Sequence, residues 1–188
     1  MTQKKSYLVP ILIGVFFILG VIYQGIMRLD YESKPKVFNT LGLNPSVKWV
    51  GKQAPDFTLT ELHTGKKLTL SKQQGNFVIL DFWASWCHTC KKQLPVLQKV
   101  YNEPKIKSKV KFYSINMKEP LSPPALRIFA RQHGYDFPIL LSNEALVKKY
   151  DIWFFPAMLI LDKTGKVVYS GAEFHSENKI RSILKKIL

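Results

Sequence analysis

One stretch constrains the fold of this chain more than any other: residues 77–97, FVILDFWASWCHTCKKQLPVL. Its first part is a continuous β-prone, apolar run, which is typical of a strand buried on both faces of a sheet. From Cys87 onward, cysteine and apolar residues recur at helical spacing as far as Tyr101. A buried strand that passes directly into a helix predicts an α/β fold.

The rest of the chain continues this alternation. Hairpins are predicted where alternating apolar and polar residues flank a glycine-containing turn, and helices where apolar residues recur on one face. The other expected elements are a hairpin over 56–70, a strand over 110–117, a helix over 122–135, an extended piece over 135–141, a helix over 144–150, a hairpin over 156–170 and a helix over 176–188. This order predicts helices layered around a central mixed sheet.

The N-terminus predicts a membrane anchor. Residues 7–27, YLVPILIGVFFILGVIYQGIM, carry no charge and are long enough for the roughly twenty helical residues that cross a bilayer. We therefore expect a single-pass anchor over 1–27 in the cytoplasmic membrane, a tether over 28–50 and a catalytic domain over 51–188. The short N-terminus is expected to stay inside, so that the domain faces the periplasm. A signal peptide and a buried core helix are the alternatives for the apolar segment.

The charge balance narrows the choice of partners. With 28 Lys and Arg against 13 Asp and Glu, the formal net charge is +15. Such a balance suits nucleic acid, an anionic membrane surface or an acidic partner. The sequence holds no nucleic-acid reader motif, so we expect no nucleic-acid partner. A plain solvated basic surface and a membrane-facing or acidic-partner role remain open.

The only two cysteines, Cys87 and Cys90, form a CxxC pair. A structural zinc site needs four ligands, commonly two such pairs. The four histidines, His63, His88, His133 and His175, are scattered along the chain, so no metal site is expected. Apart from His88, which lies inside the CxxC motif, they are expected to be surface or turn residues. A pair of inert thiols buried in the core is a second alternative.

The position of the pair favours a working dithiol. Cys87 lies at the predicted helix N-terminus, where unpaired N–H groups and the helix dipole favour a thiolate. The i to i+3 spacing puts both sulfurs on one helix face, where they can bridge. Asp81 lies inside the predicted buried strand, so burial should raise its pKa. A carboxyl of raised pKa close to Cys90 could exchange a proton with that thiol; a partnered structural Asp is the alternative.

Beyond these local patterns, DFWASWCHTCKKQLP resembles the active-site segment of thioredoxin. Residues 49–188 as a whole resemble the membrane-anchored thiol-disulfide oxidoreductases of the TlpA, ResA and DsbE type. The likeness rests on GKQAPDFTL, WCxxCK, Pro95, YDFPILL and FFPAMLILDKTGKVV. It implies a thioredoxin fold, a central mixed sheet flanked by helices, with an N-terminal β-hairpin and a central αβ insert. With the predicted anchor, one transmembrane helix would precede this fold.

The resemblance also implies roles for individual residues. Cys87 is the nucleophile that attacks the disulfide of a client protein, and Cys90 is the resolving thiol. Pro156 matches the family's cis-proline, which faces the dithiol and leaves nearby backbone groups to pair with an extended client segment. Trp86 and Phe155 would flank this client-binding surface.

Other positions near the dithiol carry weaker signals. His88 and Thr89 fill the interior of the CxxC motif and are expected to tune its redox potential. Strong oxidants of the disulfide-isomerase type carry a His directly before the second cysteine, so Thr89 at that position favours a reductant. Gln93 stands where ResA-like members carry an acid, so this protein would either use Asp81 to tune the thiols or accept weaker tuning. Trp83 is expected either to shape the surface beside the dithiol or to belong to the core.

The expected function is thiol-disulfide exchange through a redox-active Cys87–Cys90 disulfide, without a further cofactor, since the sequence has no flavin, haem or nicotinamide motif. The resemblance favours reduction of disulfides in exported proteins. Apocytochrome c, with its CxxCH motif, is the leading client, and a membrane protein is the expected electron donor. Alternatives are a disulfide-donating oxidant, an inert binding module and a Sco-type copper chaperone, which would need CxxxC. A peroxiredoxin-like peroxidase would need Pro and Thr where Leu80 and Ala84 stand.

Overall fold

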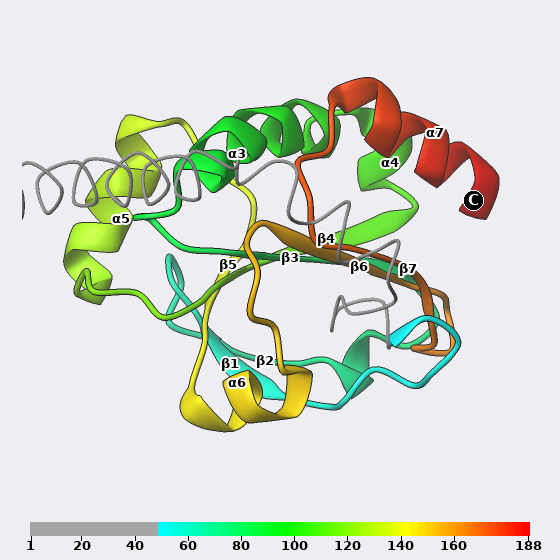
Figure 1. Cartoon of the computed structure of the whole chain (residues 1–188), viewed down its shortest axis with the longest axis horizontal. Helices are drawn as coiled ribbons and strands as arrows, with labels where there is room; N and C mark the ends of the chain where they lie inside the picture. The colour runs from blue at the N-terminus through cyan, green and yellow to red at the C-terminus, as the bar shows by residue number, and fades with distance from the viewer. Residues whose placement is uncertain (1–48) are drawn as a thin grey trace, which may run out of the picture.

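The computed structural model describes residues 49–188. They form a seven-stranded sheet with helices on both faces (Figure 1). The elements in chain order are β1 (Thr58–Glu61), β2 (Lys67–Thr69), the 3₁₀ helix η2 (Ser71–Gln73), β3 (Phe77–Trp83), α3 (His88–Tyr101), α4 (Pro104–Lys107), β4 (Val110–Asn116), α5 (Pro123–Gln132), β5 (Ile139–Leu141), α6 (Glu144–Tyr150), β6 (Ala157–Leu161), β7 (Val167–Gly171) and α7 (Glu177–Ile187).

The sheet has the strand order β2-β1-β5-β4-β3-β6-β7. Strands β3, β4 and β5 run parallel, while β6 pairs antiparallel with β3, and β1 antiparallel with β5. The predicted mixed sheet is therefore confirmed, with an antiparallel hairpin at each edge. Because parallel strands point the same way, the carboxyl ends of β3, β4 and β5 meet at one edge, which is where open α/β sheets bind their ligands.

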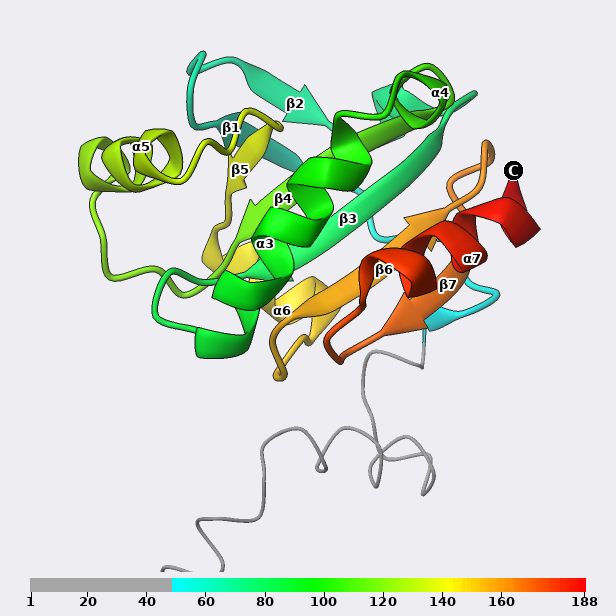
Figure 2. The same ribbon diagram turned by 90° about the horizontal axis from the view of Figure 1, so that it is seen from above.

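The core lies on both faces of β3, as its apolar sequence predicted. Every residue of this strand after Phe77 is buried. Helices α3 and α7 cover one face of the sheet, and α6 lies on the other (Figures 1 and 2). On the α6 side, Tyr150 packs its ring against Phe82 at a centroid distance of 5.4 Å and against Phe57 at 6.0 Å. Strand β3 is thus held between two layers and leads directly to the cysteines.

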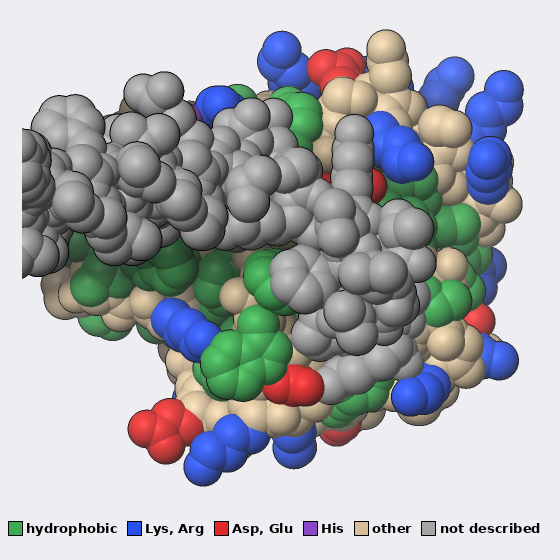
Figure 3. Space-filling view, in the orientation of Figure 1, with side chains coloured by type: hydrophobic (Ala, Val, Ile, Leu, Met, Phe, Trp, Pro, Cys, Tyr) green, Lys and Arg blue, Asp and Glu red, His purple; other side chains and the backbone are tan. Residues whose placement is uncertain are grey.

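The predicted strands and helices of the domain are all present, and the short elements η2 and α4 were not predicted. Within residues 49–188, no helix is long and apolar enough to cross a membrane. The predicted anchor over 1–27, and the tether over 28–50 except for its last two residues, lie outside the described residues. The Lys and Arg side chains visible in Figure 3 lie around the margin of the face shown.

Candidate active site

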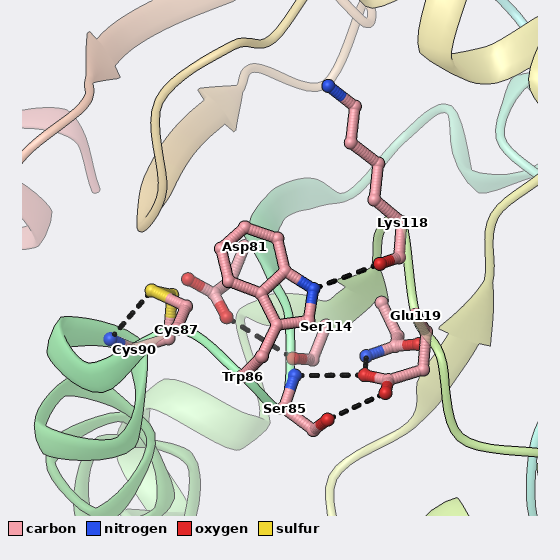
Figure 4. Close-up of a disulfide and its surroundings, with 9 residues drawn as sticks. Asp81, Ser85, Trp86, Cys87, Cys90, Ser114, Lys118 and Glu119 are labelled. Carbon is pink, nitrogen blue, oxygen red and sulfur yellow. Dashed lines mark hydrogen bonds between the residues drawn. A yellow bond between two sulfur atoms is a disulfide. The ribbon is translucent and has the colours of Figure 1, made fainter.

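Cys87 and Cys90 are joined by a disulfide bond at the start of α3 (Figure 4). Cys87 is the N-cap of this helix, and its Sγ accepts a hydrogen bond from the backbone N–H of Cys90 at 3.1 Å. The sulfur therefore lies at the helix N-terminus, where N–H groups stabilise a thiolate. Cys87 retains 6% exposure, whereas Cys90 has none. An incoming sulfur therefore meets Cys87 first.

Asp81 lies on β3, where the strand register pairs it with Ser114 of β4. The side chain is 1% exposed and accepts one hydrogen bond, from the Ser114 hydroxyl at 3.2 Å. Burial raises the pKa of Asp81 to about 7, although the hydrogen bond from Ser114 opposes this shift. Figure 4 shows the carboxylate between the disulfide and Ser114. The predicted buried acid is thus present, with a pKa that suits proton exchange near neutral pH.

The peptide bond between Phe155 and Pro156 is cis. Strand β6 starts at the next residue and pairs with β3 so that Ala157 lies opposite Phe82. This register brings Pro156 to the end of β3 from which the cysteine loop departs. The three predicted client-binding residues are brought together here, since the Phe155 ring meets the Trp86 ring edge-on at a centroid distance of 6.0 Å.

The remaining predicted positions near the cysteines differ in exposure. Trp86 is 54% exposed. In the first turn of α3, His88 is exposed and Thr89 is half-buried. Trp83 is fully buried, and its ring stacks on Phe129 with centroids 6.0 Å apart. Of the two roles considered for Trp83, the structure therefore supports the core and excludes the surface, because this residue is still part of β3.

Glu119 is a site residue that sequence reasoning missed. Its carboxylate accepts hydrogen bonds from the Ser85 backbone N–H at 2.8 Å and hydroxyl at 2.6 Å, the Asn116 amide at 2.9 Å and the Leu121 N–H at 3.0 Å (Figure 4). Partial burial raises the pKa of Glu119, but these hydrogen bonds outweigh it and hold the pKa below its usual value. Glu119 thus fixes the loop that carries Trp86, and the hydrogen bonds that hold the loop also favour its charged form.

The signal for Glu119 was its place in the sequence. It follows β4, the parallel neighbour of β3, and the ends of such strands lie at one edge of the sheet. The adjacent residue, Lys118, also contacts the loop, since its carbonyl accepts a hydrogen bond from Trp86 Nε1 at 2.9 Å (Figure 4). Residues 118 and 119 together hold the segment before the dithiol.

His175 corrects an expectation. It lies in the connection before α7, but it is 1% exposed and is not a surface residue. The Gln93 amide donates to its carbonyl at 3.2 Å and accepts from its N–H at 2.6 Å, and the Tyr169 hydroxyl lies 2.6 Å from its Nε2. Burial lowers the pKa of His175 to about 4. The ring fits because Gly171 has no Cβ, which would come within 2.9 Å of Nε2.

The copper and zinc alternatives can be compared with this arrangement. Within residues 49–188, no three His, Cys, Asp or Glu side chains lie close enough together to hold a metal ion. His133 is exposed and packs against Phe129, with ring centroids 4.3 Å apart. Among residues 49–188, the reactive pair that the structure brings together is the Cys87–Cys90 disulfide.

Comparison with known proteins agrees with this geometry. The AhpC/TSA family matches residues 50–170. The chain is 33% identical over 140 residues to the thiol-disulfide oxidoreductase ResA of Bacillus thuringiensis, covering 73% of this chain and 78% of that protein. It is 30% identical over 174 residues to ResA of Bacillus subtilis, covering 92% and 93% of the two chains.

Solved structures show the same fold. The thioredoxin domain of a thiol-disulfide oxidoreductase from Bacteroides vulgatus superimposes with a TM-score of 0.64 at 22% identity, covering 74% of this chain and 98% of that domain. The predicted thioredoxin fold is thereby confirmed. Fold, disulfide and relatives together give one conclusion: the chain belongs to the AhpC/TSA family and is a thioredoxin-like thiol-disulfide oxidoreductase of the ResA, TlpA and DsbE type.

Proposed function

We propose that this oxidoreductase reduces disulfides of exported proteins. The observation that carries the proposal is the Cys87–Cys90 disulfide at the N-terminus of α3, with a buried carboxyl of raised pKa behind it. The cysteine pair can be oxidised and reduced again by two electrons, and only Cys87 needs to contact the client. Thr89 directly before Cys90, where strong oxidants of the disulfide-isomerase type carry a His, supports the reducing direction.

The exchange proceeds in two balanced steps from the reduced dithiol. The Cys87 thiolate attacks one sulfur of the client disulfide, so that a mixed disulfide forms and the other client sulfur leaves as a thiolate. Asp81 accepts the proton of Cys90, whose thiolate attacks the Cys87 sulfur and releases the second client thiolate. The client gains two electrons, and its two thiolates take up two protons: one returns from Asp81, and the other comes from solvent and balances the proton that Cys87 lost on ionising. The protein is left with the Cys87–Cys90 disulfide, and a donor must supply two electrons for the next cycle.

The cellular setting of the proposal comes from the sequence. An uncharged segment over 7–27 supports a membrane anchor with the domain on the extracytoplasmic side. There the protein would be fed by a membrane electron donor, because abundant soluble reductants belong to the cytoplasm. Apocytochrome c is the leading client class, since a CxxCH motif must be reduced before haem attachment.

Two alternative functions make different predictions. A disulfide-donating oxidant would use the same residues with electrons flowing from the client. A Sco-type copper chaperone would bind a metal ion through the two cysteines and a histidine, and His133 and His175 are the candidates. The burial of His175 and its hydrogen bond to Tyr169 disfavour the second possibility.

The redox equilibrium of the full chain in detergent tests the direction. The protein is equilibrated in dithiothreitol and glutathione buffers, and the fluorescence of Trp86, next to the disulfide, reports its state. A midpoint near the ~−270 mV of thioredoxin is expected for a reductant. A midpoint near the ~−120 mV of DsbA would instead make the protein a disulfide donor. Absence of any reversible transition, with copper binding in a titration, would favour the metal chaperone.

A further inference from the structure

Two residues of the described chain share an unusual backbone. Among residues 49–188, Lys118, with φ 47°, and Asp151, with φ 51°, are the non-glycine residues in the left-handed region. Side chains beyond glycine are strained there, so glycine would be the easier choice. A position that keeps a side chain under strain points to a use for that side chain.

Both side chains contact the same residue, Trp153. The Asp151 carboxylate accepts a hydrogen bond from the indole Nε1. The Lys118 ammonium lies over the indole ring, 4.7 Å from its centroid. Trp153 itself is 63% exposed, so it adds little to the core. The two strained residues therefore hold an indole in place at the surface, where hydrophobic stability gains little from it.

This indole is linked through Lys118 to the loop that carries the dithiol. Trp153 is three residues before the cis-proline Pro156, and the Lys118 carbonyl accepts a hydrogen bond from Trp86 Nε1. Trp86 in turn precedes Cys87. Lys118 therefore connects the two exposed tryptophans, one through its carbonyl and one through its ammonium group.

The polar groups nearby differ in what they can still bind. A cleft of about 450 Å³ adjoins Lys118, and its charged lining residues are Lys118, Lys148, Glu119 and Glu144. The Glu119 oxygens already accept four hydrogen bonds. The Lys118 ammonium contacts an aromatic face and keeps its N–H groups for a ligand. A carboxylate next to an apolar side chain is the chemistry that complements this pair.

We propose that Trp153 and Lys118 form a client-recognition bracket, which selects client segments that carry an acidic residue and an apolar residue beside the disulfide. Trp153 contacts the apolar side chain, and the Lys118 ammonium pairs with the carboxylate. Both are specificity-determining residues that take no part in electron transfer. This inference rests on the proposed function, because it assumes that the client approaches Cys87 as a protein segment.

The test uses the reduced full chain in detergent and two synthetic peptides. Each peptide contains one intramolecular Cys-x-x-Cys disulfide; one carries Glu-Leu beside it, and the other carries Lys-Leu. The wild type is expected to reduce the Glu-Leu peptide with a kcat/KM about threefold to fivefold higher, the range of an exposed ion pair. Lys118→Glu is expected to reverse this ratio. Since the measured quantity is a ratio, a general effect on the dithiol cancels.

Three further variants separate recognition from folding. Lys118→Gly relieves the strained backbone, so it should fold at least as stably as the wild type and yet lose the preference between the peptides. Trp153→Ala should raise KM about tenfold for both peptides with little change in kcat. Lys107 also lies over an aromatic ring, 4.4 Å from the centroid of Tyr101, but next to the other end of the sheet, so Lys107→Glu should keep the wild-type ratio.

An unchanged ratio in Lys118→Glu, or an effect of Trp153→Ala on kcat alone, would overturn the bracket. Failure of the proposed function would look different. A wild type that reduces neither peptide, nor the small neutral 2-hydroxyethyl disulfide, is no disulfide reductant at all. A wild type that reduces all three disulfides but does not distinguish the peptides leaves the reductase in place and rejects the bracket.

Discussion

Two carboxylates on either side of the cysteine loop have opposite acid strengths. Asp81 of β3 is fully enclosed and receives one hydrogen bond, and its pKa is raised to about 7. Glu119, after β4, is half-buried and receives four hydrogen bonds, and its pKa is lowered. The number of donors that face each carboxylate, set against its burial, decides whether it exchanges a proton or remains charged.

The largest expected effect is on the pH dependence of stability. The raised pKa of Asp81 contributes stability below its unfolded value of 3.8, and this contribution is lost as the pH rises through about 7. The difference between the folded pKa of about 7 and the unfolded pKa of 3.8 corresponds to at most about 4 kcal/mol in the free energy of unfolding. Asp81→Asn should therefore be more stable than the wild type at pH 8.5 by up to that amount, and similar to it at pH 4. Denaturant unfolding of the disulfide form between these pH values measures the difference; equal curves would mean that Asp81 is not the enclosed acid described.

The second-largest expected effect is on the rate of mixed-disulfide release, which should distinguish Asp81 from Glu119. Asp81→Asn should slow release of the mixed disulfide about 100-fold, the low end for loss of a general acid–base group. Glu119→Gln should slow it much less, because Glu119 only positions the loop. Rapid-quench measurement of the mixed disulfide resolves this step. Equal slowing in both variants would contradict the division of roles.

For Glu119 the expected pH dependence of stability is opposite to that for Asp81. Its lowered pKa contributes stability above the unfolded value of 4.5 that is lost as the pH falls through the folded pKa. Glu119→Ala should cost about 2 kcal/mol at neutral pH, since several donors must turn to water at a half-exposed site. It should also change Trp86 fluorescence.

The matched control is Asp162, whose carboxylate accepts from Thr164 and from the Lys166 N–H in the turn between β6 and β7. Hydrogen bonds to Asp162 also lower its pKa. Asp162→Ala should destabilise the fold without altering Trp86 emission. If both variants change the Trp86 emission, the hydrogen bonds to Glu119 have no specific effect on the cysteine loop.

The smallest expected effect concerns Ser114. Its hydroxyl is the one group that lowers the pKa of Asp81, so Ser114→Ala should raise that pKa further and move the pH profile of mixed-disulfide release to higher pH. The rate at its optimum should change little. A shift of the profile to lower pH would show that another group sets the acid strength of Asp81.

The same contrast explains what the sequence could predict. Asp81 was found because its burial follows from the apolar run around it within one strand. Glu119 was missed because its donors include Ser85, which lies 34 residues away in the chain. Local periodicity carries no information about such a pairing; only the parallel alignment of β3 and β4 creates it.

The errors have the same origin. The burial of His175 depends on Gln93, 82 residues away, and on the absence of a side chain at Gly171. Trp83 could be assigned to the core only once the end of β3 was known to a single residue. The fold, the dithiol and the cis-proline followed from motifs, whereas hydrogen-bond partners far apart in the chain did not.

The hydrogen bonds between Gln93 and the backbone of His175 limit which residues can replace Gln93. The Gln93 amide offers one donor and one acceptor to the backbone of residue 175, and an ionised carboxylate offers acceptors alone. A carboxylate at position 93, one helical turn after Cys90, would face the His175 carbonyl without a proton to donate. A mutational path to an acid at this position therefore passes through a rearranged loop before α7. The two positions are expected to show strong epistasis, so a library that varies residue 93 alone would find few acids there.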